Sequence, residues 1–218
     1  MRVLLICDDR YHPGDIPANG VAPLAKQGFE FDIIMNGNDF KPEALKNYSV
    51  VLLCKCDNIS AADLNAWKTP EAQRALVDFV ENGGGLLVIH SGMVSGAETA
   101  ALDRLIGCRF VSHPAQCPVT VQPIKPHPVT LGVGAFTEVD EHYNVEMLSG
   151  DADMLMASYS DQPKEGDPIH NCINPGGYVR AQGKGRVCVL MPGHLLPVWL
   201  NPQFQRTLAN SLRWCGEP

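Results

Sequence analysis

The segment from Gly83 to Gly92 constrains the fold of this chain more than any other. Its leading glycines suit the end of a helix, because glycine adopts the left-handed backbone that helix C-termini need. Leu86 to Ile89 is then an unbroken apolar run, typical of a strand buried on both faces of a parallel sheet. His90 and Ser91 follow directly, and ligands of open α/β sheets bind beyond the carboxyl ends of the strands. The segment therefore predicts a buried strand that ends in site residues.

Further apolar runs and helical patterns along the chain predict the same kind of sheet. Strands are expected at residues 2–7, 29–35, 49–54 and 186–191, and helical segments at 19–27, from 70, at 98–106 and from 202. This alternation is typical of a mostly parallel sheet with helices on both faces. Because the crossovers are right-handed, the carboxyl ends of these strands should meet at one edge.

The middle of the chain follows another pattern. From Cys108 to about Ser160, short strands (118–124 and 154–160) alternate with prolines and glycines. This stretch has too little continuous apolar sequence for a core of its own, so it predicts a β-rich elaboration of the sheet. Gly183 to Gly185 predicts a tight hairpin turn before the last strand. We expect one α/β domain over residues 1–218.

Composition narrows the classes of function. The net charge of -7 argues against a nucleic-acid partner, since such proteins usually carry a basic patch. No apolar stretch is long enough for a transmembrane helix, and the N-terminal apolar run reaches Asp8 and Asp9 too soon for a signal peptide. We therefore expect a cytoplasmic protein with no membrane partner. Most of the eight cysteines lie in apolar runs and are interpreted as reduced core thiols.

Three of the seven histidines follow the ends of expected parallel strands: His12, His90 and His194. A single histidine in such a place is most simply a structural residue, but three at one sheet edge favour a site. His113 and the run from Asp140 to Tyr143 lie in the elaboration, which we expect to fold over that edge.

Imidazoles beside a carboxylate suit two kinds of chemistry. They provide general acid/base catalysis near neutral pH, and they are ligands for a divalent metal such as zinc. The spacing leaves both open, because no HExxH pair occurs. His127 and His170 are interpreted as loop residues.

A set of motifs in order along the chain resembles the ThuA-like (trehalose utilisation) family. They are Gly83 to Gly92, Leu105-Ile106-Gly107, His113-Pro114, His127-Pro128, Asp140 to Tyr143, Gly183 to Val187, Pro192-Gly193-His194 and Asn210 to Trp214. The resemblance implies a flavodoxin-like three-layer sandwich related to class I glutamine amidotransferases. It also implies a role in carbohydrate utilisation, on oxidised (keto) sugars or their glycosides.

The amidotransferase relationship breaks down at two positions. Those enzymes have a cysteine nucleophile at the strand-to-helix elbow where this chain has Ile89-His90-Ser91, and a glutamate where it has Leu196. The histidine after the last strand is kept as His194. This pattern argues against glutaminase activity and for other chemistry in the same crevice.

The leading hypothesis is an isomerase, lyase or hydrolase that acts on a small carbohydrate. The resemblance assigns catalysis to His90, His113, Glu141 and His194, and we expect His12, Ser91, His142 and Tyr143 to bind substrate. One alternative is a hydrolase with Ser91 as nucleophile and His194 as base, although the Gly-x-Ser-x-Gly elbow is absent. Another is a non-catalytic sugar-binding or regulatory module. Self-association into a homo-oligomer is left open.

Overall fold

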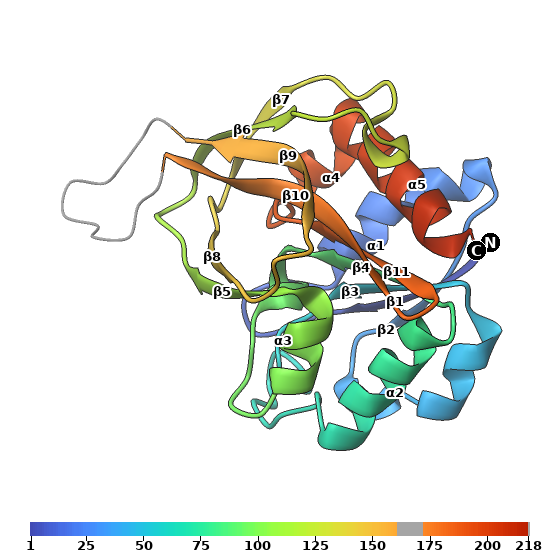
Figure 1. Cartoon of the computed structure of the whole chain (residues 1–218). Helices are drawn as coiled ribbons and strands as arrows, with labels where there is room; N and C mark the ends of the chain where they lie inside the picture. Colours follow the sequence, from blue (N-terminus) through green and yellow to red (C-terminus); the bar gives the residue numbers. More distant parts are fainter. Residues whose placement is uncertain (161–171, 218) are drawn as a thin grey trace.

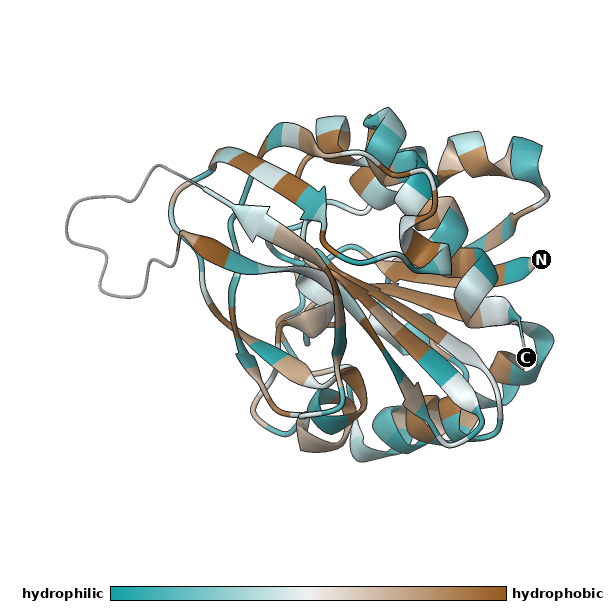
Figure 2. Ribbon diagram, turned by 45° about the horizontal axis from the view of Figure 1, so that its top comes forward, coloured by the Kyte–Doolittle hydropathy of each residue, from teal (hydrophilic) through white to brown (hydrophobic). Residues whose placement is uncertain are grey.

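The computed structural model describes residues 1–160 and 172–217, which are built around a nine-stranded sheet (Figure 1). The strand order is β2-β1-β3-β4-β11-β10-β9-β6-β7. The first five are parallel to one another: β1 (Arg2–Cys7), β2 (Glu30–Ile34), β3 (Val50–Cys54), β4 (Gly85–Ile89) and β11 (Gly185–Leu190). This parallel half corresponds to the strands expected from the apolar runs, which appear as mostly hydrophobic ribbons in Figure 2.

Helices cover both faces of the parallel half. One layer holds α1 (Asp15–Val21), α4 (Leu196–Leu200) and α5 (Pro202–Gly216), and the other holds α2 (Pro70–Glu81) and α3 (Ala100–Ile106). Successive strand residues point to opposite faces, so Leu5 packs in the first layer and Ile6 in the second. The fold is therefore the expected three-layer α/β sandwich of flavodoxin-like type.

The predicted elaboration extends the same sheet. Four antiparallel strands continue it beyond β11: β10 (Ile173–Gln182), β9 (Asp153–Tyr159), β6 (Cys117–Pro123) and β7 (Phe136–Asp140). A separate pair, β5 (Cys108–Ser112) with β8 (Asn144–Met147), lies beside this antiparallel extension. The hairpin turn expected at Gly183 joins β10 to β11, and Gly183 has a φ of 58°, the conformation that glycine tolerates best.

Short 3₁₀ turns complete the described chain: η1 (Ala22–Gln27), η2 (Gly37–Asp39), η3 (Pro42–Asn47), η4 (His90–Met93) and η5 (Pro128–Thr130). The helix expected at 19–27 begins earlier, as α1, and changes into η1. Pro23 has no N–H to continue the α-helical hydrogen bonds, and the segment ends at Gly28, whose φ is 86°.

None of the helices in residues 1–160 and 172–217 combines the length and apolar character that a membrane crossing requires. His170, interpreted above as a loop residue, lies outside the described residues.

Candidate functional site

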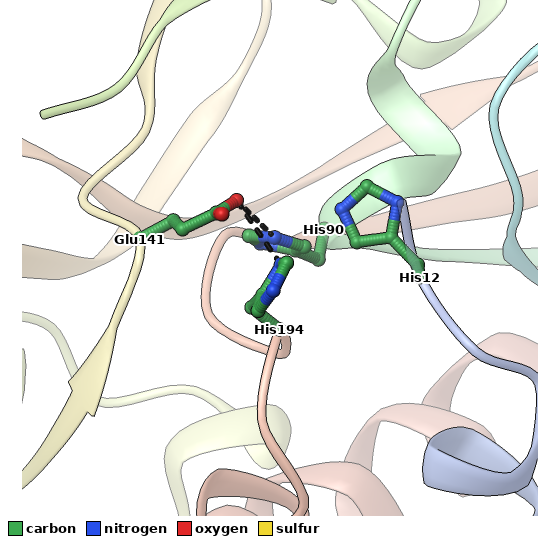
Figure 3. Close-up of side chains that lie close together, drawn as sticks. All are labelled: His12, His90, Glu141 and His194. Carbon is green, nitrogen blue, oxygen red and sulfur yellow. Dashed lines mark hydrogen bonds and ion pairs between the residues drawn. The ribbon is translucent and has the colours of Figure 1, made fainter. Parts of the chain in front are cut away.

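The three histidines predicted at the strand ends come together at the carboxyl edge of the parallel half. His12 follows β1, His90 follows β4 and His194 follows β11. The centres of their rings are 5.0 to 5.4 Å apart (Figure 3). We call these three residues with Glu141 the histidine–glutamate cluster. His12, Glu141 and His194 line one pocket, whereas His90 is 1% exposed and lies buried beside it.

His90 occupies a strained turn at the centre of the cluster. Its φ is 47°, a backbone conformation uncommon for residues other than glycine and often found at functional sites. The Nδ1–H of its ring donates a hydrogen bond of 2.9 Å to the carbonyl of Met191. Gly193 allows the neighbouring loop to approach, since a Cβ there would lie 2.8 Å from Ile89 Cγ2 and 3.3 Å from His90 Cβ. The turn is thus held from β11.

Glu141 reaches the cluster from the antiparallel extension, directly after β7 (Figure 3). Its Oε2 atom lies 3.1 Å from His194 Nδ1 and 3.3 Å from His90 Nε2. The distance to His113 Nε2 is 3.5 Å. One carboxylate oxygen therefore faces three imidazole nitrogens, and the extension closes over the sheet edge as predicted.

Two buried aspartates fix the loops that carry the cluster. Asp140 accepts hydrogen bonds from the backbone N–H groups of Glu141, Gly193 and His194, at 2.9, 2.8 and 3.0 Å. Burial raises the pKa of Asp140, although these donors and the charge of His90 oppose the shift.

On the other side, Asp9 accepts N–H bonds from Tyr11, His12 and Cys56 at 2.9, 3.1 and 3.0 Å. It also accepts the ring Nδ1–H of His12 at 2.7 Å. Burial would raise the pKa of Asp9, but the hydrogen bonds and charge of His12 outweigh it and lower the pKa. Asp9 is therefore an anion that orients His12.

The cluster shifts the pKa values of its members in different directions. Burial would raise the pKa of Glu141, but hydrogen bonding and positive charge at His194 and His90 lower it well below the usual range. Burial lowers the pKa of His12 despite its bond to Asp9. Burial would also lower the pKa of His194, but the hydrogen bond and charge of Glu141 outweigh this effect and raise the pKa. Groups with oppositely shifted pKa values are typical of acid/base sites.

A pocket of about 360 Å³ opens onto the cluster. Its polar wall consists of His12, His113, Glu141 and His194, and its other lining residues are Tyr11, Cys56, Val94, Phe110 and Tyr143. The ring of Tyr143 stacks on His90, with centres 3.9 Å apart and planes inclined by 27°. Burial raises the pKa of Tyr143 well above its usual value, so the phenol is neutral at physiological pH. The pocket thus combines aromatic surface with ionisable groups.

Chemistry rather than size identifies this pocket. A larger depression of about 560 Å³ lies at the opposite edge of the sheet, where Gly83 and Gly84 precede β4. No histidine lines it.

Two residues expected to bind substrate lie elsewhere. His142 is buried on the far side of its strand end, where its Nε2 lies 3.1 Å from Ser158 Oγ. Adjacent residues in an extended chain point in opposite directions, so Glu141 and His142 do not both face the pocket. Ser91 is 2% exposed and borders a cavity of about 10 Å³, room for about one water molecule.

Sequence reasoning missed five residues of the site: Asp9, Tyr11, Cys56, Val94 and Phe110. The position of Asp9 just after an expected strand was the available signal for a loop-organising carboxylate. The other four carried no pattern that separates pocket residues from ordinary loop and strand residues.

An α/β sandwich with an antiparallel extension and a histidine-rich crevice defines the class of this protein. The family model for trehalose utilisation (ThuA) matches residues 2–215, so the chain belongs to the ThuA family. The comparison with curated proteins finds no match.

Solved structures support the fold. A ThuA-like protein from Parabacteroides merdae has 17% identity and a TM-score of 0.78, covering 99% of this chain and 90% of that one. Another, from Bacteroides uniformis, has 20% identity and a TM-score of 0.72, covering 99% and 91%. A β-galactosidase from Rahnella sp. R3 matches with 16% identity and a TM-score of 0.67, covering 97% of this chain but 31% of that one.

Proposed function

We propose that this protein is a cytoplasmic carbohydrate-utilisation enzyme that moves protons on a small sugar or keto-sugar derivative. The carrying observation is the pocket of about 360 Å³, which joins aromatic rings to a cluster of imidazoles and a carboxylate in a ThuA-family chain. Its volume falls within the ~300–1,000 Å³ typical of small-molecule sites. Aromatic faces such as Phe110 and Tyr143 suit the apolar faces of sugar rings, and the ionisable groups suit their oxygens.

His113 is placed to move the proton. Its Nδ1–H donates to the carbonyl of Pro114 at 2.7 Å, so in the neutral ring Nε2 carries a lone pair on the pocket side, 3.5 Å from Glu141 Oε2. Its side chain is 34% exposed, so the proton can exchange with water. In a keto-sugar, His113 removes a proton from the carbon beside the carbonyl, and the bonding electrons shift onto the carbonyl oxygen.

The buried side of the pocket is placed to stabilise that oxygen. His12 and His194 line the pocket there, and the hydrogen bond and charge of Glu141 raise the pKa of His194, so that His194 can donate a proton to a substrate oxygen on which charge develops. Return of the proton to a different carbon gives isomerisation, and loss of a neighbouring substituent gives elimination. A serine-hydrolase mechanism has weaker support, because Ser91 is buried beside a space too small for a sugar.

Proton abstraction can be tested directly in heavy water. Trehalose and simple glycosides oxidised to ketones would be incubated with the protein, with and without added zinc, and followed by NMR for deuterium incorporation and product formation. We expect exchange beside the carbonyl and turnover of at least one keto-sugar. His113→Ala should lower kcat/KM by roughly 10²–10⁴-fold. His127→Ala, whose ring packs on Trp214 instead, is the control and should keep full activity. Binding of these sugars without exchange or turnover would identify a binding module instead.

A further inference from the structure

We propose that the histidine–glutamate cluster (His12, His90, Glu141 and His194) binds a divalent first-row transition ion, with zinc the first to test. One ligand atom from each residue lies within 4.8 Å of the others. The four side chains point toward one another in Figure 3. The inference goes beyond the proposed function, because metal binding can be measured without any substrate.

The hydrogen bonds around the cluster fix which ring nitrogens face inward. Met191 O and Asp9 Oδ1 can only accept, so the Nδ1 atoms of His90 and His12 carry hydrogens. In the neutral rings the Nε2 atoms are therefore bare. Metal-ligating histidines show this arrangement, with the second nitrogen donating to a carbonyl or carboxylate. Cys56 lies near His12 but does not belong to the four residues whose ligand atoms converge.

The contacts of Glu141 favour a cation within the cluster. Its Oε2 lies 3.3 Å from Nε2 of His90, which carries no hydrogen in the neutral ring, and 3.1 Å from Nδ1 of His194. Two atoms that only accept repel each other unless a positive charge lies between them. Bonds of about 2.0–2.1 Å to a tetrahedral ion space its donor atoms ~3.3 Å apart. The two distances from Glu141 Oε2 match that spacing, and the other pairs of ligand atoms lie within 4.8 Å of one another.

The three rings have the arrangement of a three-histidine site. Metal–nitrogen bonds of that length place the centres of ligating imidazoles ~5 Å apart, and the observed separations are 5.0, 5.1 and 5.4 Å. The planes are inclined to one another by 73° to 78°, so the rings do not stack. Protonating all three instead would place three positive charges together in a buried site, which is unfavourable.

The donor set indicates the class of ion and its role. Imidazole nitrogens favour zinc, cobalt, nickel, copper or iron over magnesium and calcium, which prefer oxygen. His12, Glu141 and His194 also line the pocket, so one side of the bound ion faces the space where a substrate would lie. An ion open on one side takes an oxygen ligand, and the ketone or hydroxyl oxygen of a sugar has the right chemistry.

The test is metal binding by the purified chain without added affinity-tag histidines. The protein would be stripped with chelator, loaded with zinc, dialysed and analysed by elemental mass spectrometry, and loading with cobalt would give a visible spectrum that reports the coordination. We expect about one ion per chain and a rise in Tm on zinc addition, since an ion that binds only the folded state stabilises it. His90→Ala and His194→Ala should each weaken zinc affinity by more than about 100-fold, because loss of an outer-shell partner alone costs roughly 10–100-fold.

Two matched histidine variants sharpen the result. His113→Ala should keep one ion per chain, because His113 lies beside Glu141 but outside the cluster, and His127→Ala should do the same. If His90→Ala does not fold because of its strained turn, His194→Ala and Glu141→Gln carry the test. A wild-type chain that retains no zinc or cobalt, or cluster variants that bind as tightly as wild type, would overturn the proposal. Zinc binding without sugar turnover would refute the proposed function alone, whereas full turnover by stripped protein that binds no zinc would refute the metal site alone.

Discussion

The parallel half and the antiparallel extension contribute different chemistry to one site. Strands β1, β4 and β11 of the parallel half end in His12, His90 and His194. The extension contributes the negative charge that faces them, Glu141, together with His113 and Tyr143. Neither part forms the site alone. The difference teaches that the parallel half provides the imidazoles of the cluster, whereas the added strands provide the carboxylate that faces them.

Each part holds its contribution in place with a buried aspartate. Asp9 binds three backbone N–H groups in the loops after β1 and β3. Asp140 binds three N–H groups across the boundary, one in the extension and two in the loop after β11. Asp9 thus organises the parallel half internally, whereas Asp140 joins the two parts. The predictions below separate these contributions.

The largest effect is expected from removing the charge that the extension provides. Glu141→Gln keeps the shape of the side chain but leaves the imidazoles without their anion, and we expect kcat/KM for the keto-sugar substrate to fall by roughly 10²–10⁴-fold. Glu146→Gln is the matched control, because it removes a half-exposed carboxylate of β8 that pairs with Arg109. Steady-state kinetics of both variants and wild type measure this change in kcat/KM. Equal activity of Glu141→Gln and wild type would mean that the extension contributes no catalytic charge.

The junction between the two parts can be broken at Asp140. Asp140→Ala leaves three backbone N–H groups without their acceptor, and each buried unsatisfied group costs about 1–3 kcal/mol. The variant no longer carries the free-energy cost of burying the carboxylate, and this offsets part of the loss. We therefore expect the free energy of unfolding to fall by about 2–4 kcal/mol. Urea denaturation of the variant and wild type measures this difference in the free energy of unfolding. A loss below about 0.5 kcal/mol, the range of ordinary surface substitutions, would show that Asp140 does not hold the junction.

The same division explains what the sequence could predict. The strands of the parallel half are unbroken apolar runs followed by His12, His90 and His194, so their convergence follows from topology alone. Glu141 was singled out by resemblance to the ThuA-like family, because a carboxylate after a short alternating strand has no pattern of its own. His142 shows the limit, since resemblance highlighted the whole run from Asp140 to Tyr143, and only the extended backbone decides which side chains face the pocket. Asp9 and Phe110 act through contacts with residues distant in sequence, which no local pattern encodes.

A smaller effect is expected from the aspartate of the parallel half. In Asp9→Asn the amide can offer an N–H to His12 Nδ1, which favours the opposite tautomer and turns a hydrogen rather than a lone pair toward the cluster. Loss of such an outer-shell partner typically costs roughly 10–100-fold in metal affinity or activity. We expect that loss together with a lower stability, because an amide N–H turned toward His12 Nδ1 replaces the acceptor of the Tyr11 and His12 N–H groups, and only the N–H of Cys56 keeps its acceptor. Zinc affinity and unfolding measured side by side check this, and a loss of stability with unchanged zinc affinity would show a purely structural role for Asp9.

The smallest expected effect concerns the turn that carries His90. The buried ammonium of Lys68 donates to the carbonyls of Gly92 and Val94, at 3.4 and 3.0 Å, and so supports η4 from within the parallel half. Burial lowers the pKa of Lys68 below its usual 10.5, although neighbouring acidic groups oppose the shift. As pH rises through the lowered pKa, the folded protein releases this proton before the unfolded chain does, so the unfolded chain binds more protons and stability increases. This contribution is complete above pH 10.5 and is lost as pH falls through the folded pKa.

Lys68→Met removes that titration. The free energy of unfolding of wild type minus that of the variant should therefore rise as the pH approaches 10.5 from below, even though buried thiols and phenols shift both proteins in the opposite direction. Lys46→Met, at an exposed position of η3, should leave the difference flat. Parallel pH profiles for wild type and Lys68→Met up to pH 10.5 would mean that folding does not lower the pKa of Lys68. The hydrogen bonds to Gly92 and Val94 and the neighbouring acidic groups would then compensate fully for the burial of the ammonium beneath the His90 turn.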